Sequence, residues 1–249
     1  MIVLVTGASS GFGASIARKF AANGHRVIAA ARRIDRLQKL ATEIGPSLLP
    51  IVMDVTDRQS VETALASLSA DWQEIDVLVN NAGLALGIKP AHEASLEDWE
   101  TMIATNCKGL ATVTRLVLPG MVARDRGHVI NISSSAGPYA YPGANAYGAS
   151  KAFVDQFSQN LRADLAGTNV RSCNIVPGLA GGTEFSNVRL KDDAAAAKVY
   201  ENTTPLGPDD IAEAVFWVTT QPPHVNVNKL EILPTCQGFG PLSIKRRPA

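Results

Sequence analysis

Short runs of apolar, largely β-branched residues alternate with amphipathic segments along this chain. The apolar runs are continuous, which is typical of parallel strands covered by helices on both faces. The predicted strands are Ile2–Val5, Val27–Ala31, Leu48–Met53, Val77–Val79, Val129–Ile132, Val170–Val176 and Lys229–Leu233. The predicted helices between them are Ala14–Ala22, Asp35–Ile44, Ser60–Ser69, Leu96–Val122 and Ala149–Leu165. This repeated strand–helix order predicts an α/β fold with a doubly wound, open parallel sheet.

No linker, composition shift or internal repeat divides residues 1–249, so we expect a single domain. Its irregular stretch, Pro177–Pro208, contains the glycine pair Gly181-Gly182 and a short predicted helix at Asp193–Tyr200. Paired glycines beside a short helix are typical of a hinged lid. We therefore predict that residues 180–206 form a lid over the substrate.

The composition limits the classes of function. Of 249 residues, 46% are hydrophobic, which is enough for a well-filled core, and 23 basic residues balance 23 acidic ones. A net charge of +0 does not provide the cationic surface that nucleic acid or an anionic membrane requires, so we expect neither partner. The apolar start Met1–Val5 is too short to cross a bilayer and has no basic region, which favours a cytoplasmic protein.

The cysteines and histidines argue against a metal site. Three cysteines and four histidines are scattered without the spacing of metal ligands, so we predict reduced thiols and no metal. The basic cluster Lys245-Arg246-Arg247 at the C-terminus is interpreted as a solvated tail.

A glycine-rich turn follows the first predicted strand and precedes the first predicted helix. It reads Thr6-Gly7-Ala8-Ser9-Ser10-Gly11-Phe12-Gly13. Glycines let the backbone approach a pyrophosphate, which then lies at the positive end of the helix. The spacing differs from G-x-G-x-x-G, and similar turns occur without a nucleotide, but the strand–turn–helix context predicts a dinucleotide site.

The end of the second predicted strand distinguishes the two nicotinamide dinucleotides. Dinucleotide folds place an acid there for a free ribose 2′-hydroxyl, or an arginine nearby for a 2′-phosphate. Here the strand is followed by Arg32 and Arg33, with no acid at its end. Because a guanidinium binds phosphate with paired hydrogen bonds, we predict NADP (NADPH) as the cofactor. We expect Arg36 to be a surface residue of the next helix, and Asp35 to lie inside that helix, away from the ribose.

Tyr147 and Lys151 stand four residues apart in a predicted helix, so their side chains share one face. A tyrosine with a pKa near ~10 is a poor acid or base at neutral pH. We expect the cation of Lys151 to stabilise the phenolate and lower the pKa of Tyr147.

Several motifs together resemble the classical short-chain dehydrogenase/reductase family over nearly the whole chain. They are Thr6–Gly13, Asn80-Asn81-Ala82-Gly83, Asn106, Ser134, Tyr147-x3-Lys151 and Pro177-Gly178, in this order. The resemblance implies a single Rossmann domain, with a doubly wound seven-stranded parallel sheet and helices on both faces. It also implies a homotetramer assembled through the Tyr147/Lys151 helix.

The resemblance also implies roles for single residues. Tyr147 would be the general acid/base, and Lys151 would lower its pKa and bind the nicotinamide ribose. Ser134 would polarise the substrate carbonyl, and Asn106 would hold a water that links Lys151 to solvent. The cofactor-binding positions so implied are Gly7, Ser9, Ser10, Gly11, Phe12, Gly13, Arg32, Arg33, Asp54, Val55, Asn80, Ala82, Gly83, Tyr147, Lys151, Pro177, Gly178 and Thr183.

Two stretches, 83–92 and 181–189, are similar to the NADP-dependent 3-hydroxy acid dehydrogenases within this family. The similarity implies small 3-hydroxy acids as substrates, of the serine, allo-threonine or 3-hydroxypropionate type. An anionic substrate requires a cation near Tyr147, and Arg189 in the predicted lid is the candidate. Arg189 could instead be a solvated lid residue or a contact between subunits. Thr183 and Glu184 would either touch a cofactor phosphate or cap the lid helix.

Two other functions remain open. Tyr139 and Tyr141 would lie near the pocket mouth and could admit bulkier carbonyls, which would favour a broad-specificity NADPH-dependent carbonyl reductase for ketones or β-keto esters. A non-catalytic NADP-sensing protein would be expected to lack the catalytic tyrosine, lysine or serine, and all three are present.

Overall fold

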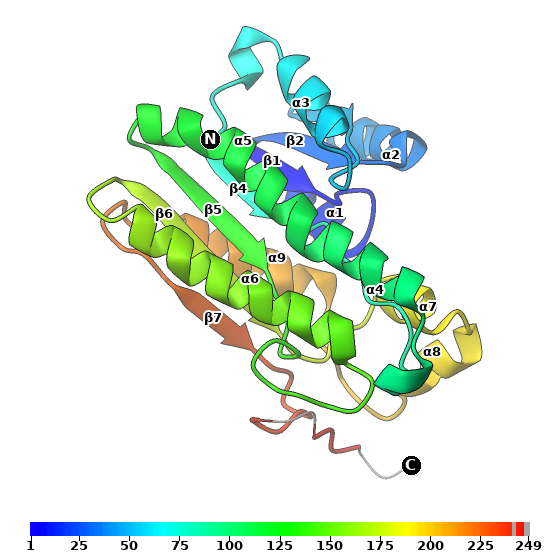
Figure 1. Cartoon of the computed structure of the whole chain (residues 1–249). Helices are drawn as coiled ribbons and strands as arrows, with labels where there is room; N and C mark the ends of the chain where they lie inside the picture. The colour runs from blue at the N-terminus through cyan, green and yellow to red at the C-terminus, as the bar shows by residue number, and fades with distance from the viewer. Residues whose placement is uncertain (241–242, 247–249) are drawn as a thin grey trace.

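A parallel sheet forms the centre of the molecule in the computed structural model, which describes residues 1–240 and 243–246. The strand order is β3-β2-β1-β4-β5-β6-β7 (Figure 1). The strands are β1 (Ile2–Thr6), β2 (Arg26–Ala31), β3 (Leu48–Val52), β4 (Val77–Asn80), β5 (Gly127–Ile132), β6 (Val170–Pro177) and β7 (Lys229–Ile232). All seven predicted strands are present, so the prediction of one α/β domain with a doubly wound parallel sheet is confirmed.

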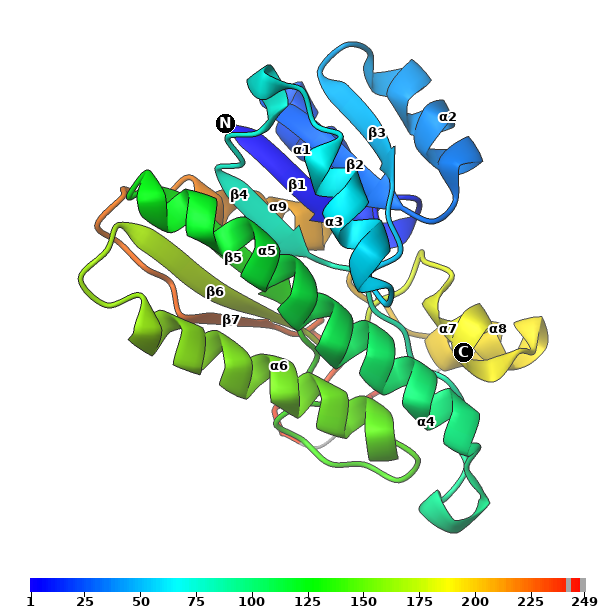
Figure 2. The same cartoon turned by 45° about the horizontal axis from the view of Figure 1, so that its top comes forward.

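Two layers of helices cover the sheet, one on each face (Figure 2). The helices are α1 (Gly11–Ala22), α2 (Ile34–Ile44), α3 (Arg58–Ala66), α4 (Leu96–Ile103), α5 (Leu110–Ala123), α6 (Asn145–Asp164), α7 (Phe185–Leu190), α8 (Asp193–Tyr200) and α9 (Pro208–Thr219). Short segments of other helix types are η1 (Ala70–Trp72), η2 (Ala91–Glu93) and the π-helical η3 (Ala104–Gly109).

Alternation of side chains along the strands divides the core into two clusters. On β1, Val3 and Val5 pack with α1, α2 and α9, whereas Leu4 between them packs with α3, α5 and α6. Successive side chains of a strand point to opposite faces, so a continuous apolar strand supplies both clusters. This is the physical reason why the central strand β1 has no polar alternation, whereas the edge strand β7 alternates charged and apolar residues.

Three helical regions differ from the predictions. The predicted helix Leu96–Val122 is one helical run in which η3 joins α4 to α5. Neither α7 nor α9 was predicted. The start of α9 has proline at its first position, and the Asp210 carboxylate accepts a hydrogen bond from the Gly207 amide, a common way to begin a helix.

The strand order reverses between β1 and β4, because the chain runs from β1 outward to β3 and then returns. Open α/β sheets bind ligands at such a reversal, beyond the carboxyl ends of the strands. In Figure 1, α7 and α8 lie beyond this end of the sheet. The turns that follow β1, β2, β4, β5 and β6 therefore converge on one region, beneath the segment predicted to be a lid.

Candidate active site

A cavity of about 880 Å³ occupies this region and gathers most of the predicted site residues. Those in its wall are Gly7, Ser9, Ser10, Gly11, Phe12, Arg32, Arg33, Asp54, Val55, Ala82, Gly83, Ser134, Tyr147, Lys151, Pro177, Gly178, Thr183 and Arg189. Gly13, Asn80 and Asn106 are not part of the wall. The volume is within the range of about 300–1,000 Å³ that is usual for ligand pockets.

The glycine-rich turn forms one part of this wall at very close range. Gly7 and Gly11 have positive φ angles of +66° and +51°, where side chains with a Cβ are strained. A Cβ on Gly13 would lie 2.5 Å from the Gly7 carbonyl oxygen. The turn leads directly into α1, whose free amide groups face the end of the sheet, so this part of the cavity fits a pyrophosphate.

Three arginines gather at the end of β2. Arg33 Nη2 donates hydrogen bonds to the hydroxyls of Ser9 and Ser10, at 3.1 and 3.0 Å. It also lies 3.0 Å from Glu184, and Arg36 lies 2.6 Å from the other oxygen of the same carboxylate. Arg36 is therefore not the plain surface residue that we expected. Arg32 is exposed beside them and lines the cavity, so the cluster fits a phosphate group.

Tyr147 and Lys151 lie side by side on α6, each only 6% exposed. Lys151 Nζ donates a hydrogen bond to the Ile132 carbonyl oxygen at 2.9 Å. Burial raises the pKa of Tyr147 to about 12 and lowers the pKa of Lys151 to about 8, since a buried site disfavours the charged form of each.

The expectation that Lys151 lowers the pKa of Tyr147 does not describe this structure. The groups that lower that pKa against the effect of burial are the Ser134 hydroxyl, by a hydrogen bond, and the Arg189 guanidinium, by its charge. The guanidinium carbon of Arg189 lies 5.5 Å from the centre of the Tyr147 ring. A residue of the predicted lid thus supplies the cation that acts on the phenol.

The three consecutive serines after β5 have different positions. All three line the cavity, but only the Ser134 hydroxyl is among the groups that lower the pKa of Tyr147. Ser133 instead donates to the Lys151 carbonyl oxygen and to Asp155, while the Ser135 amide binds the Pro177 carbonyl. Of the three, Ser134 is the one placed to contact a substrate oxygen beside Tyr147.

Asn106 lies in η3 and is 1% exposed. Its side chain bonds both the amide and the carbonyl of Leu84, each at 2.9 Å, and donates to Ser150. It therefore fixes the loop after β4 against α6 at Ser150, the residue before Lys151. The water-holding role remains a prediction.

The resemblance implied that Asn80 contacts the cofactor, but the structure has Asn81, and not Asn80, in the cavity wall. The Asn80 amide donates to Thr114 and Asn131 inside the core, each at 2.8 Å. Asn81 lies in the cavity wall, and its amide donates to the Thr6 and Gly7 carbonyl oxygens. Asn81 thus supports the glycine-rich turn directly, and Asn80 lies behind it.

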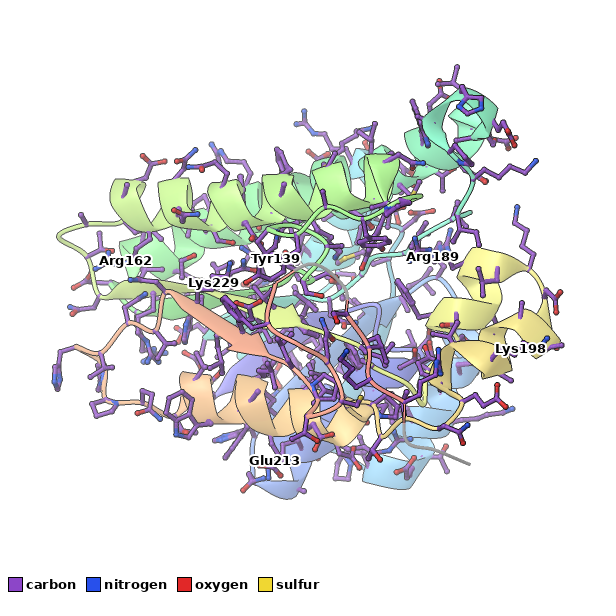
Figure 3. All side chains as sticks on the ribbon, turned by 90° about the horizontal axis from the view of Figure 1, so that it is seen from below. Tyr139, Arg162, Arg189, Lys198, Glu213 and Lys229 are labelled. Carbon is purple, nitrogen blue, oxygen red and sulfur yellow. The ribbon has the colours of Figure 1, made fainter. Side chains whose placement is uncertain are left out.

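The predicted lid begins beside the glycine-rich turn and extends over Tyr147. The Thr183 methyl would meet a Cβ on Gly11 at 3.1 Å, and the Thr183 hydroxyl accepts from the Phe185 amide at the start of α7. The Phe185 ring lies 5.7 Å from the Tyr147 ring. Figure 3 shows Arg189 and Lys198 on this side of the molecule, away from Arg162 and Lys229.

Arg189 is held by three groups from other loops. It donates to the Tyr141 hydroxyl at 3.0 Å, to the Gly87 carbonyl at 3.2 Å and to the Gly143 carbonyl at 3.5 Å. Tyr141 lines the cavity, whereas Tyr139 is not part of its wall and makes an edge-to-face contact with Phe239. These contacts rule out a freely solvated Arg189 in this structure.

Some features of the site were not predicted, notably Asn81, the Phe185 contact and the Arg36–Glu184 ion pair. Asn81 belongs to the motif that was recognised, but the sequence did not show which of its two asparagines faces inward. The other two contacts join residues far apart in the chain and leave no local pattern.

Three further observations concern the described residues. Within 1–240 and 243–246, no group of three or more His, Cys, Asp or Glu side chains could hold a metal ion. No helix there is both long and apolar enough to cross a membrane. In the C-terminal basic cluster, Arg246 donates to the backbone carbonyls of Val199 and Glu201 at the end of α8, and Arg247 lies outside the described residues.

Residues 1–194 match the family model described as short chain dehydrogenase, so the chain belongs to the short-chain dehydrogenase family. Together with the NADP-dependent dehydrogenases among its relatives, this match shows that the chain is an oxidoreductase acting on CH–OH groups.

The chain is also similar to particular family members over nearly its full length. It is 62% identical to the NADP-dependent 3-hydroxy acid dehydrogenase YdfG of Salmonella typhi, over 99% of this chain and 100% of the relative. It is 45% identical to serine 3-dehydrogenase of Agrobacterium fabrum, over 98% of both. The solved structure of the closed form of serine dehydrogenase complexed with NADP+ matches with a TM-score of 0.96 and 59% identity, over 99% of this chain and 100% of that one.

Proposed function

We propose that this protein is an NADP-dependent oxidoreductase that interconverts the C3 hydroxyl and carbonyl of small 3-hydroxy acids. The observation that carries the proposal is the position of Arg189 over Tyr147, in a cavity whose other end has the arginine cluster at β2. One cation there suits a small carboxylate beside the reacting carbon, and the others suit a 2′-phosphate. The names of the relatives agree with both assignments.

The residues of the chain supply what the cofactor does not. NADP, when bound, accepts or supplies the hydride. In the reductive direction Tyr147 donates a proton to the substrate oxygen, and in the oxidative direction its phenolate accepts that proton. Ser134 donates a hydrogen bond to the same oxygen and stabilises the negative charge that develops on it. Lys151 lies on the same helical face, four residues on, and would hold the nicotinamide ribose.

The residues of the cavity wall support a position for the cofactor. Gly7, Ser9, Ser10, Gly11 and Phe12 would hold the pyrophosphate, with Gly13 giving the close approach behind them. Arg32 and Arg33 would hold the 2′-phosphate. Asp54 and Val55 would contact the adenine. The residues proposed for the nicotinamide half are Ala82, Gly83, Pro177, Gly178 and Thr183.

Arg189 would select the substrate by its charge. Its Nη2 contact with the Gly143 carbonyl is 3.5 Å long and gives only a weak hydrogen bond. A substrate carboxylate would replace it with a shorter, charge-assisted one. Because Arg189 also contacts Tyr141 and lies over Tyr147, a carboxylate bound to it would keep the C3 oxygen near the phenol.

We also propose that residues 180–206 act as a lid, that the protein is a homotetramer and that it works in the cytoplasm. The lid is supported by the glycine pair before α7 and by the match to a closed, NADP-bound structure. Association is supported by exposed apolar side chains on the helical layer that carries Tyr147, among them Ile103 and Phe153, with Phe153 stacked on Phe157. Analytical ultracentrifugation would measure the assembly directly.

A comparison of substrates for the wild type and two lid variants tests the function. L-serine, 3-hydroxypropionate and neutral alcohols would be assayed with NADP+, and neutral ketones with NADPH. We expect Arg189→Ala to raise KM for the hydroxy acids by about 10-fold or more, the effect of losing a charged hydrogen bond, while leaving KM for the neutral substrates unchanged. Lys198→Ala is the matched control, since Lys198 is another cation of the cavity wall with no contact to Tyr147 among its described contacts.

Two outcomes would contradict the proposal. If Arg189→Ala raised KM equally for hydroxy acids and for neutral substrates, Arg189 would be a structural residue of the proposed lid. A wild type that prefers ketones or β-keto esters over every hydroxy acid would favour the broad-specificity carbonyl reductase, which the cavity wall with Tyr141 and Phe185 would also accommodate.

A further inference from the structure

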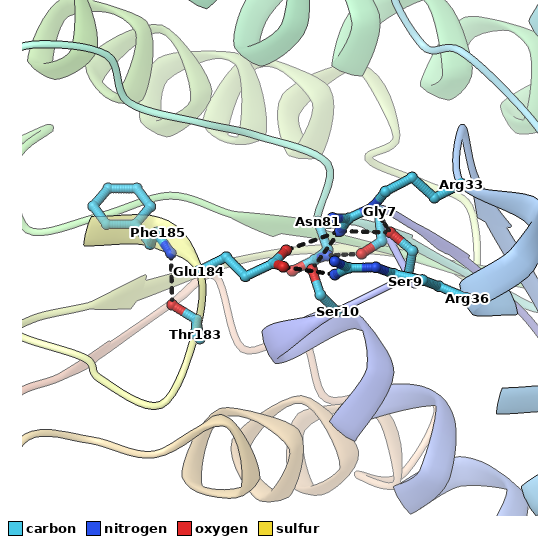
Figure 4. Close-up of polar contacts among 9 residues, drawn as sticks. All are labelled: Gly7, Ser9, Ser10, Arg33, Arg36, Asn81, Thr183, Glu184 and Phe185. Carbon is cyan, nitrogen blue, oxygen red and sulfur yellow. Dashed lines mark hydrogen bonds and ion pairs between the residues drawn. The ribbon is translucent and has the colours of Figure 1, made fainter. Parts of the chain in front are cut away.

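Glu184 lies between two of the three arginines at the end of β2. Its Oε2 is 3.0 Å from Arg33 Nη2, and its Oε1 is 2.6 Å from Arg36 Nη1 (Figure 4). The two arginines and the glutamate come from opposite ends of the site, because Glu184 immediately precedes α7. The carboxylate of Glu184 therefore faces Arg33, one of the two arginines that we assign to the 2′-phosphate.

The carboxylate of Glu184 is an anion that a ligand could displace. The two guanidiniums hold its pKa at about 2, so it is ionised at neutral pH. Its side chain is 43% exposed, so solvent and ligands can reach it. A phosphate facing the same guanidiniums would be repelled by the carboxylate and would compete with it for the donors.

Two of the three guanidinium nitrogens of Arg33 already donate hydrogen bonds. Its Nε and Nη2 bond Ser9, and Nη2 also bonds Ser10 and Glu184. A 2′-phosphate that is bound by Arg33 with paired hydrogen bonds must take over donors already in use. The contact with Glu184 is the one that a stronger anion can replace, since the serines belong to the same turn as the phosphate site.

A displacement of Glu184 would also move residues that contact Tyr147, at the other end of the cavity. The residue after it is Phe185, whose ring lies 5.7 Å from that of Tyr147, and Arg189 of the same short helix lies over the Tyr147 ring. The chain from Glu184 to Arg189 is thus anchored at the arginines on one side and at Tyr147 on the other.

We propose that Glu184 is a specificity-determining residue that competes with the cofactor's 2′-phosphate for Arg33 while Arg36 holds its other oxygen, and so couples binding of that phosphate to the position of α7. The proposal rests on the assignment of the β2 arginines to the 2′-phosphate. The two ion pairs of Glu184 hold the start of α7 to Arg33 and Arg36. Binding of a 2′-phosphate to Arg33 releases the contact of Arg33 with Glu184. The contacts of Phe185 with Tyr147 and of Arg189 with Tyr141 then position α7.

Ligand binding measures the competition without any catalysis. Adenosine 2′,5′-bisphosphate and adenosine 5′-monophosphate differ only in the 2′-phosphate, and calorimetric titration gives Kd for each. For Glu184→Gln we expect the bisphosphate to bind about three- to tenfold more tightly than it binds the wild type, the scale expected for two partly exposed ion pairs. The monophosphate should bind the variant and the wild type equally.

Two further variants separate the possible failures. Glu201→Gln removes a carboxylate from the other end of the same segment, away from the arginines, and should leave both affinities unchanged. Arg33→Ala should abolish most of the preference for the bisphosphate. If it does not, the arginine assignment is wrong. If it does while Glu184→Gln binds both ligands like the wild type, the proposal for Glu184 alone is overturned.

Hydrogen exchange of the α7 amides tests the coupling. In the wild type, adenosine 2′,5′-bisphosphate should speed exchange in α7 and the monophosphate should not. In Glu184→Gln, exchange should already be fast without ligand and should not change further. Unchanged or slower exchange of α7 in the wild type with the bisphosphate would contradict the coupling.

Discussion

The guanidinium carbon of Arg189 lies 5.5 Å from the centre of the Tyr147 ring, so the segment over the cavity places a positive charge against the phenol. Burial raises the pKa of Tyr147 to about 12, and Arg189 is one of two groups that oppose this shift. The same side chain that we assign to the substrate carboxylate thus also favours the phenolate. Arg189 therefore connects the proposed lid, residues 180–206, with the group that we propose transfers the proton.

Replacing Arg189 should therefore change the pH profile of oxidation. The phenolate is the base in that direction, and a nearby cation lowers the pKa at which it forms. In Arg189→Met the pKa of Tyr147 should rise, so the ascending limb of kcat against pH should move to higher pH. At neutral pH the oxidation rate should fall several-fold, since each pKa unit corresponds to about tenfold in phenolate.

Lys198→Met provides the comparison, because it removes a cavity cation that is not among the groups acting on Tyr147. An unchanged limb in Arg189→Met, or one moved to lower pH, would show that the charge of Arg189 has no such effect.

Tyr147→Phe should remove the proton donor while keeping the cavity. The ring remains packed against Phe185, and only the hydroxyl bonded to Ser134 is lost. Steady-state kinetics should show kcat lower by about 10²- to 10⁴-fold, with the Kd of NADPH nearly unchanged by fluorescence titration. Turnover close to that of the wild type would rule out the assignment of Tyr147.

Gly13→Ala should disrupt the cofactor turn. The added Cβ would lie 2.5 Å from the Gly7 carbonyl oxygen and 2.6 Å from Asn81 Nδ2, so the turn must move. We expect a loss of about 1–3 kcal/mol in the free energy of unfolding, typical of an overpacked site, and much weaker NADPH binding. Chemical denaturation and titration measure the two effects.

Gly207→Ala is a suitable control for the glycine prediction. Its φ is −90°, and the nearest atom to an added Cβ is 3.6 Å away. If Gly13→Ala were as stable as Gly207→Ala and bound NADPH equally well, the close approach of the turn would not matter.

His128 should make stability depend on pH below neutrality. It is 1% exposed on β5, neither ring nitrogen has a partner among the described residues, and burial lowers its pKa to about 3, with a contribution from Arg171 on β6. Between pH 6.5, the value of an unfolded histidine, and pH 3, only the unfolded chain binds this proton. The free energy of unfolding should therefore fall with decreasing pH, by up to about 1.4 kcal/mol per unit from this residue.

In His128→Leu this part of the pH dependence should disappear. Urea denaturation of both proteins at several pH values between 7 and 4 gives the difference directly. Parallel curves for the variant and the wild type would mean that His128 is not kept neutral by the fold.

The local pattern of apolar and polar residues was sufficient to predict the strands and the parallel sheet. Strands such as β1 and β4 were found because a strand covered on both faces is apolar at nearly every position, which is visible in a few consecutive residues. The edge strand β7 was found although it alternates charged and apolar residues. The helix α9 was missed, although Pro208 followed by two acidic residues is a recognisable helix start. The short α7 was missed because its six residues are held by contacts with the rest of the cavity.

For the site, the sequence by itself picked out most of the residues that we propose carry the chemistry, since the glycine turn, the arginines after β2 and the Tyr147/Lys151 spacing are all short-range features. Only the tertiary structure decided how they act on one another. It paired Arg33 and Arg36 with Glu184, 151 and 148 positions away, and made Arg189 the cation that lowers the pKa of Tyr147. Burial and charge proximity depend on which distant segments meet, and no local pattern encodes that.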